Sequence, residues 1–289
     1  MISSAISPII GVIIIDLFLF MMQNYIKFRK APNNLLVFSN FAVLNMKCMR
    51  YRFIIFLIII LIFIPVQTVY STNDREVLKH NISMKKIFLC SSFADVASIL
   101  SESVSVPLRG KTVAFIPTAS IHEEYTQYVE DAKVAFDSLG IIVKELEITQ
   151  CSKNEMEEVL TNCDCIYVSG GNTFFLLQEL RKTGADKYII EQVEKGKLYI
   201  GESAGAMILA PNVEYAKDMD DCYSLTSGVE DFVGLGIVGF YPVVHFDSYP
   251  FEKAAREVVN KNSHLPLKII TNQQAIVVVG NNIVIKERK

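Results

Sequence analysis

The segment from Gly201 to Ala206 reads GESAGA and lies between the apolar runs 198–200 and 207–209. A G-x-S-x-G sequence between a strand and a helix is typical of a nucleophile elbow, a sharp turn that exposes the serine hydroxyl. The glycines remove Cβ atoms that would clash there, and the start of the following helix offers N–H groups to an oxyanion. Ser203 is therefore the candidate nucleophile. The alternative is a tight strand–helix turn without chemistry.

A serine nucleophile needs a general base, and this chain has only four histidines. His80 and His264 lie in polar segments, and His122 lies at the start of a predicted helix. His245 alone ends an apolar strand. Catalytic groups gather outside the carboxyl ends of parallel strands, so Ser203 and His245 can converge. The competing interpretation is a histidine at the edge of the core with no catalytic role.

The base in turn needs a group that orients it. Asp218, Asp220 and Asp221 follow the elbow in a loop that must pass over the same edge of the sheet, and Asp247 is a further candidate. The alternative is a solvated acidic turn. Residue type and spacing alone do not rank these aspartates.

The segment from Ser169 to Thr173 reads SGGNT and connects a predicted strand to a predicted helix. Such a glycine turn can direct backbone N–H groups at a developing oxyanion. Phosphate binding is the lesser alternative, because the segment lacks both a P-loop Lys-Ser/Thr and a G-x-G-x-x-G sequence. The C-x-C pair of Cys163 and Cys165 has no second ligand pair nearby. We therefore predict no metal.

From Met84 onward, strands and helices of about ten residues alternate, a pattern that predicts a mostly parallel sheet with helices on both faces. The predicted strands are 86–90, 112–117, 141–148, 165–168, 198–200, 243–246, 268–271, 275–279 and 283–286. The predicted helices are 93–103, 123–139, 154–160, 173–180, 186–195 and 251–260. Residues 84–289 are expected to form one domain.

Residues 1–83 form an apolar extension that ends in a polar linker. The stretch from Phe53 to Tyr70 is uncharged and 18 residues long, so as a helix it would span about 27 Å. The run 1–20 is weaker, because Asp16 interrupts it.

Three interpretations of the extension compete. It is a membrane anchor whose basic residues before Phe53 stay in the cytoplasm, a signal peptide from an internal start at Met46 or Met49, or an upstream translation artefact with the true start at Met84. The first makes the protein membrane-associated through Phe53 to Tyr70, and the last makes it cytoplasmic.

Four segments carry a resemblance to a known family. The segments are GGNTF at 170–174, the elbow GESAGA at 201–206, Asp218-Met219 and His245-Phe246. They resemble the dipeptidase E branch of the S51 serine peptidases. The resemblance extends from Met84 to Ile285. It implies a three-layer, doubly wound, flavodoxin-like fold of the class I glutamine-amidotransferase type.

The same resemblance implies roles for individual residues. Ser203 would be the nucleophile, His245 the base and Asp218 the orienting acid. The oxyanion hole would be formed by backbone N–H groups of Gly170 or Gly171 and of Ala204.

The implied activity is hydrolysis of short peptides, in particular dipeptides with N-terminal Asp, through an acyl-enzyme and without metal or cofactor.

One alternative is a glutamine-amidotransferase-like domain, which would need cysteine at the elbow. Another is a non-catalytic, membrane-tethered binding module, which would leave His245 or Asp218 poorly placed. An α/β-hydrolase would need more chain after the elbow. The formal net charge of −3 predicts no nucleic-acid binding, and oligomeric state is not predicted.

Overall fold

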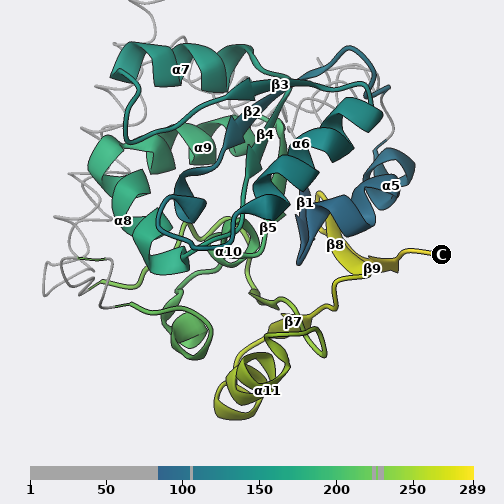
Figure 1. The fold of residues 1–289 in the computed structure, drawn as a ribbon, viewed down its shortest axis with the longest axis vertical. Helices are drawn as coiled ribbons and strands as arrows, with labels where there is room; N and C mark the ends of the chain where they lie inside the picture. Colours follow the sequence, from purple (N-terminus) through teal and green to yellow (C-terminus); the bar gives the residue numbers. More distant parts are fainter. Residues whose placement is uncertain (1–83, 105–106, 223–225, 227–230) are drawn as a thin grey trace, which may run out of the picture. The chain divides into compact units, whose positions relative to one another are not determined.

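The computed structural model describes residues 84–104, 107–222, 226 and 231–289. These residues build a seven-stranded sheet in the order β3-β2-β4-β5-β1-β8-β9 (Figure 1). The first five strands in that order are mutually parallel, whereas β8 and β9 are antiparallel to their neighbours. The bounds are β1 (Lys86–Cys90), β2 (Thr112–Ile116), β3 (Ile142–Glu145), β4 (Cys165–Val168), β5 (Leu198–Glu202), β8 (Gln274–Val279) and β9 (Asn282–Glu287).

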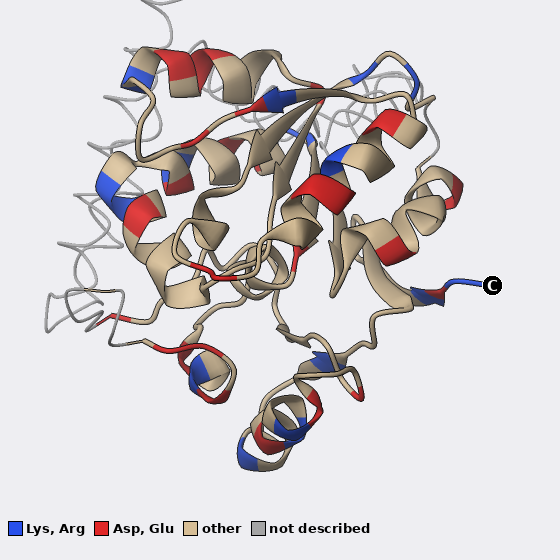
Figure 2. Ribbon diagram, in the orientation of Figure 1, with Lys and Arg blue, Asp and Glu red and all other residues tan. Residues whose placement is uncertain are grey.

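Helices cover both faces of this sheet, because alternate residues of each central strand pack to opposite sides. In β1, Phe88 and Cys90 pack into the cluster formed with α5 (Phe93–Ser103) and α6 (Gln127–Ser138). Ile87 and Leu89 pack into the cluster on the other face. That cluster includes residues of α7 (Lys153–Asn162), α8 (Thr173–Thr183) and α9 (Ala185–Glu194). Charged residues lie mainly on the helices, whereas the central strands are largely uncharged (Figure 2).

The chain after the elbow forms a second, two-stranded sheet. Strands β6 (Tyr241–Val243) and β7 (Leu267–Ile269) are parallel and are connected through α11 (Glu252–Lys261). These elements lie below the main sheet in Figure 1. The sequence predicts strands at 243–246 and 268–271 but does not predict that they form a sheet of their own, as the structure shows. Two parallel strands end side by side here as well, so the carboxyl ends of β6 and β7 meet.

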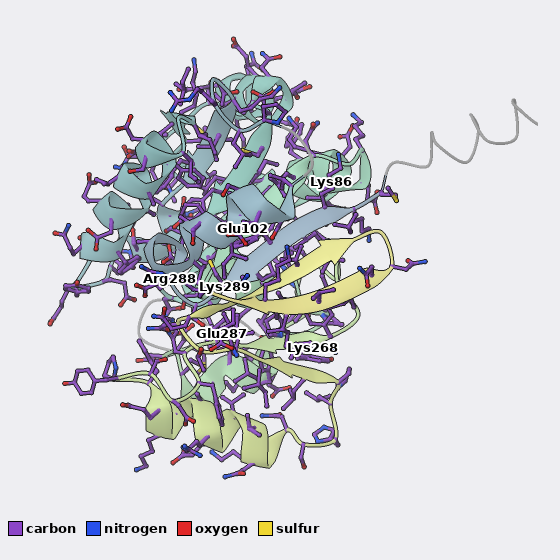
Figure 3. All side chains as sticks on the ribbon, turned by 90° about the vertical axis from the view of Figure 1, so that its right-hand side faces the viewer. Lys86, Glu102, Lys268, Glu287, Arg288 and Lys289 are labelled. Atoms are coloured by element: carbon purple, nitrogen blue, oxygen red, sulfur yellow. The ribbon has the colours of Figure 1, made fainter. Side chains whose placement is uncertain are left out.

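The chain ends in the β8–β9 hairpin, which pairs with β1 through β8. Figure 3 labels Glu287, Arg288 and Lys289 at its end, beside α5 with Glu102. Lys286 Nζ donates to the Glu102 carbonyl at 3.4 Å, and an Arg288 N–H donates to the Asp95 carbonyl at 3.0 Å. The hairpin is therefore fixed to α5 as well as to β1.

The fold class predicted from the sequence is confirmed: helices flank a central, mostly parallel sheet. The start of one helix differs from the prediction. Helix α6 begins at Gln127, so His122 lies in a turn and not at a helix start.

None of the helices within the described ranges is long and apolar enough to cross a membrane. The apolar stretch from Phe53 to Tyr70 lies outside the described residues, and the predictions made for residues 1–83 stay predictions.

Candidate active site

Ser203 lies in a strained turn between β5 and the short helix α10 (Ala204–Met207). Its backbone has φ 48° and ψ −109°, a conformation that non-glycine residues rarely adopt. The turn is closed tightly: a Cβ on Gly201 would lie 2.3 Å from the Gly205 carbonyl oxygen, and one on Gly205 would lie 2.1 Å from that of Val168. Only glycine fits at these two positions, so the G-x-S-x-G spacing is required by the turn, and the Ser203 side chain remains half-buried.

His245 follows β6 and comes to the Ser203 hydroxyl. Its Nε2 atom lies 3.0 Å from Ser203 Oγ, within the range expected for a nucleophile and its base. The Phe251 ring stacks on the imidazole with centroids 4.7 Å apart and planes inclined by 28°. The structure therefore brings together the serine and the histidine singled out from the sequence, although they come from different sheets.

The other ring nitrogen of His245 faces Asn272, a residue that the sequence analysis missed. His245 Nδ1 lies 2.8 Å from Asn272 Oδ1. An amide oxygen only accepts hydrogen bonds, so Nδ1 carries the proton and Nε2 is the acceptor of the Ser203 O–H. Asn272 follows β7. Because β6 and β7 are parallel neighbours, their ends place His245 and Asn272 side by side.

The environment of His245 favours its neutral form. Burial lowers the pKa of the imidazole, while the hydrogen bond to Asn272 and the charge of Asp95 oppose that change. A neutral imidazole with a free Nε2 lone pair is the form that can accept the serine proton.

Asp218 is paired with a lysine. It ends the 3₁₀ turn η3 (Glu214–Asp218), and its carboxylate forms an ion pair with Lys261 of α11. Asp247 is paired with Arg256 in the same way. Both Asp218 and Asp247 thus have cationic partners, whereas the proton on His245 Nδ1 points at Asn272. In this structure Asn272, and not Asp218, is the residue hydrogen-bonded to His245 Nδ1.

Asp220 supports the glycine turn instead of the base. Its carboxylate accepts the Thr173 N–H at 2.9 Å at the start of α8, and burial raises its pKa to about 6. The Asn172 side chain donates to the Asp221 carbonyl at 2.8 Å. The same amide caps α8 by accepting the N–H groups of Phe174 and Phe175. The acidic loop therefore fixes the turn from Gly170 to Thr173.

The glycine turn lies against Ser203. A Cβ on Gly170 would lie 3.2 Å from Ser203 Cβ, and Gly171, with φ 129°, has no room for one because the Ala119 carbonyl oxygen would be 2.0 Å away. Among the described residues, the N–H groups of Gly170, Gly171 and Ala204 have no hydrogen-bond partner. Free backbone donors beside a serine hydroxyl are the groups that an oxyanion requires.

Two ionisable groups lie behind the elbow. The Glu202 carboxylate, 3% exposed, accepts the Phe93 N–H at 2.9 Å and the Tyr167 hydroxyl. Burial raises its pKa to about 7. Cys90 Sγ lies 3.6 Å from the Gly201 carbonyl oxygen, and burial raises the pKa of this thiol well above its ordinary value.

The cysteines and the remaining histidines of the described chain show no metal-site geometry. No three His, Cys, Asp or Glu side chains within the described ranges are placed to hold an ion. Cys163 and Cys165 are buried, and His122 packs edge-on against Phe175 with ring centroids 4.7 Å apart. His264 is exposed after α11.

Known proteins resemble this chain over the part that holds the site. The sequence model of peptidase family S51 matches residues 87–286. An uncharacterised peptidase of Listeria monocytogenes is 45% identical over 204 residues, which are 70% of this chain and 98% of that protein. A peptidase E of a Nostoc species is 27% identical over 169 residues, 58% of this chain and 64% of that protein.

Solved structures also resemble this chain. A crystal structure named "Putative Peptidase E Protein", from Listeria monocytogenes EGD-e, superposes with a TM-score of 0.68 at 45% identity and covers 71% of this chain and 100% of that one. A peptidase from an acI-B1 actinobacterium shares the fold, with a TM-score of 0.53 at 22% identity over 72% of this chain and 90% of that one.

Proposed function

The chain belongs to peptidase family S51 and is a serine-type peptidase, and on that premise we propose that Ser203 is its nucleophile and His245 its general base. One observation carries the proposal: Ser203 Oγ, on a strained elbow, lies 3.0 Å from Nε2 of His245. We propose the N–H groups of Gly170 or Gly171 and of Ala204 as the oxyanion hole, because these donors lie free beside the hydroxyl.

The proposed reaction is acyl transfer through a covalent intermediate. His245 Nε2 takes the Ser203 proton while Oγ attacks the scissile carbonyl, and the tetrahedral oxyanion is held by the backbone N–H groups. The imidazolium then protonates the leaving amine, and an ester remains on Ser203. Water, deprotonated by the same imidazole, attacks this ester and releases the acid. The sequence of steps uses no group outside the protein other than substrate and water.

Asn272 takes the place at Nδ1 that the resemblance implied for Asp218. An amide there fixes the tautomer and the orientation of the ring, because its oxygen accepts the Nδ1 proton at 2.8 Å. It contributes no full negative charge to stabilise the imidazolium. We therefore propose Ser203, His245 and Asn272 as the working set.

Cysteine chemistry of the glutamine-amidotransferase kind is disfavoured by the state of Cys90, a thiol that contacts the elbow. Cys90 lies behind the elbow, is fully buried and has a raised pKa. A nucleophilic cysteine needs the opposite, an accessible thiolate with a lowered pKa.

The proposed substrates are short peptides, and dipeptides with N-terminal Asp are the first class to assay because the dipeptidase E resemblance implies them. Recognition of an aspartate side chain calls for a cation. Arg256 is a cation of the neighbouring helix α11; its guanidinium pairs with Asp247 and lies 5.2 Å from the Phe246 ring centroid. Asn272 and Phe251, which hydrogen-bond to and stack on His245, are uncharged, so the comparison of Asp-Leu with Ala-Leu is the informative one.

Peptide hydrolysis by matched variants tests the proposal. We expect Ser203→Ala and His245→Ala each to lower kcat by at least about a thousandfold, with unchanged thermal unfolding. His264→Ala, which removes an exposed histidine, is the matched control and should retain wild-type kcat. Wild-type rates in Ser203→Ala would refute the nucleophile. Equal rates on Asp-Leu and Ala-Leu would refute aspartyl specificity and leave the chemistry standing.

A further inference from the structure

The turn between β1 and α5, residues 90–93, contacts the segments that carry Ser203, His245 and Asn272. The Ser203 N–H donates to the Cys90 carbonyl at 2.9 Å, and the Phe93 N–H donates to the Glu202 carboxylate at 2.9 Å. These two contacts fix the turn to the nucleophile elbow. The proposed reaction uses no side chain of this turn.

Within the turn, the Ser91 hydroxyl bridges the base and the segment that holds the orienting amide. Ser91 Oγ accepts the backbone N–H of His245 at 2.9 Å and donates to the Thr271 carbonyl at 3.1 Å, the residue before Asn272. The Ile270 carbonyl oxygen lies further away, at 3.5 Å. Ser91 is 1% exposed, so water does not compete for these contacts.

The His245 backbone makes this contact necessary. Strand β6 ends at Val243, and His245 adopts φ 56°, a left-handed conformation that is strained for a non-glycine residue. In that conformation its N–H leaves the ladder with β7, and a buried N–H without an acceptor is rare and costly. Ser91 Oγ supplies the acceptor and so holds the residue whose ring must point at Ser203.

We propose that Ser91 is a positioning residue of the catalytic site: through one hydroxyl it fixes the His245 backbone and the Asn272 segment relative to the Ser203 elbow. The proposal rests on the proposed function. Ser91 touches no reacting atom. It acts by keeping the distances Ser203 Oγ–His245 Nε2 and His245 Nδ1–Asn272 Oδ1 short at the same time.

The test measures how fast a fluorophosphonate labels Ser203. This rate depends on the serine–histidine pair, and its measurement requires no known peptide substrate. Serine attack on phosphorus expels fluoride, and the serine proton goes to His245. We expect Ser91→Ala to lower the maximal labelling rate about 10- to 100-fold, because displacement by about 1 Å costs rates of that order. The half-saturating probe concentration should change less than about twofold.

Matched variants separate positioning from general destabilisation. Ser92→Ala removes the next hydroxyl along the chain, which does not cap α5, and should label at the wild-type rate. Ser91→Thr keeps a hydroxyl and should recover most of the rate. Ser91→Cys keeps the volume with a weaker acceptor and should show the loss even if Ser91→Ala does not fold.

A double-variant cycle gives the sharpest result. If Ser91 acts through the His245–Asn272 pair, the fold-decrease in labelling rate of the double variant Ser91→Ala/Asn272→Ala will be far smaller than the product of the fold-decreases of the two single variants. Losses that multiply, or wild-type labelling in Ser91→Cys, would overturn the proposal. An unlabelled wild-type protein would instead refute the proposed function, so the two failures are distinguishable.

Discussion

At the scale of single residues, His245 has an amide where serine hydrolases with a full triad have a carboxylate. Asn272 accepts the Nδ1 proton and so presents Nε2 to the Ser203 hydroxyl. The amide orients the ring without the charge that would stabilise the imidazolium. Asp218, which the family resemblance pointed to, is engaged with Lys261. The roles of Asn272 and Asp218 are therefore separable by substitution.

We predict that Asn272→Ala lowers kcat about 100-fold, because the ring loses its orientation and its fixed tautomer. Asp218→Ala should leave kcat within about twofold, since it removes only an ion pair with a largely exposed lysine. Steady-state kinetics on one peptide substrate would check both. A larger loss of kcat in Asp218→Ala than in Asn272→Ala would instead assign the orienting role to Asp218.

The pH dependence of activity follows from the neutral state of His245. Burial lowers its pKa, so the acid limb of kcat/KM should have its midpoint below about 6.5, the ordinary value for histidine. Asn272→Asp places a carboxylate at Nδ1, which favours the imidazolium and should move that midpoint to higher pH. A pH–rate profile of both proteins, with circular dichroism at each pH, measures the shift. If the midpoint of Asn272→Asp stays at the wild-type pH or moves to lower pH, residue 272 is not the group that faces His245 Nδ1.

Residue type and strand position were enough to single out Ser203 and His245 from the sequence. Asn272 was not predicted, because an asparagine in a loop belongs to no motif and the orienting group was expected to be an acid. A usable signal existed: Asn272 directly follows the predicted strand 268–271, just as His245 lies at the end of another. Pairing those two strand ends required knowledge that β6 and β7 are neighbours, and local patterns do not contain this information.

At the scale of elements, the buried Glu202 carboxylate connects β5 to the start of α5. It accepts the first helical N–H, that of Phe93, and the Tyr167 hydroxyl of β4. Cys90, Asp95, Tyr128 and Asp131 are the other titratable groups that act on it or are acted on by it. The acid therefore joins three parts of the fold directly behind the elbow.

Stability should fall with rising pH through the titration of Glu202. Its pKa is about 7 in the folded chain, against an ordinary value of 4.5. The folded state thus binds more protons in that window, and the stabilisation is complete below pH 4.5 and lost as pH rises through 7. The upper limit of the effect is about 3 kcal/mol.

Glu202→Gln keeps an acceptor for Phe93 and a polar partner for Tyr167 but does not titrate. Denaturant unfolding from pH 5 to pH 8 should therefore show a smaller loss of stability in the variant than in the wild type. Identical slopes in the two proteins would exclude Glu202 as the titrating group.

Most elements were predictable from the sequence, because the buried strands and amphipathic helices have strong periodic patterns. The observed bounds of β1, α5 and β4 coincide with those predicted. The second sheet was not predicted: β6 and β7 have three residues each, too few for their pattern to show which sheet they join. The start of α6 was placed too early because the charged turn before it continues the helical pattern.

At the scale of the whole molecule, the described groups needed for the proposed reaction lie between residues 84 and 289. The Listeria relative aligns over 98% of its own length with 204 residues of this chain. Such a protein has little room for a counterpart of residues 1–83. We propose that the chain is organised as an extension, 1–83, and a peptidase domain, 84–289.

A fragment of residues 84–289 should accordingly fold and retain activity. The hydrophobic clusters on both faces of the sheet are built by residues of this range. We expect cooperative thermal unfolding and a kcat within about twofold of the full chain, measured side by side. An aggregated or inactive fragment would show that the extension contributes to the fold or to the site.

The central claim is that Ser203, activated by His245, is a working nucleophile. Intact-mass measurement after treatment with a fluorophosphonate tests it most directly. We predict one adduct per chain, located by proteolysis to the peptide that contains Ser203, and no adduct in Ser203→Ala or His245→Ala. A folded wild-type protein that remains unlabelled, or a label that persists in Ser203→Ala, would contradict the account.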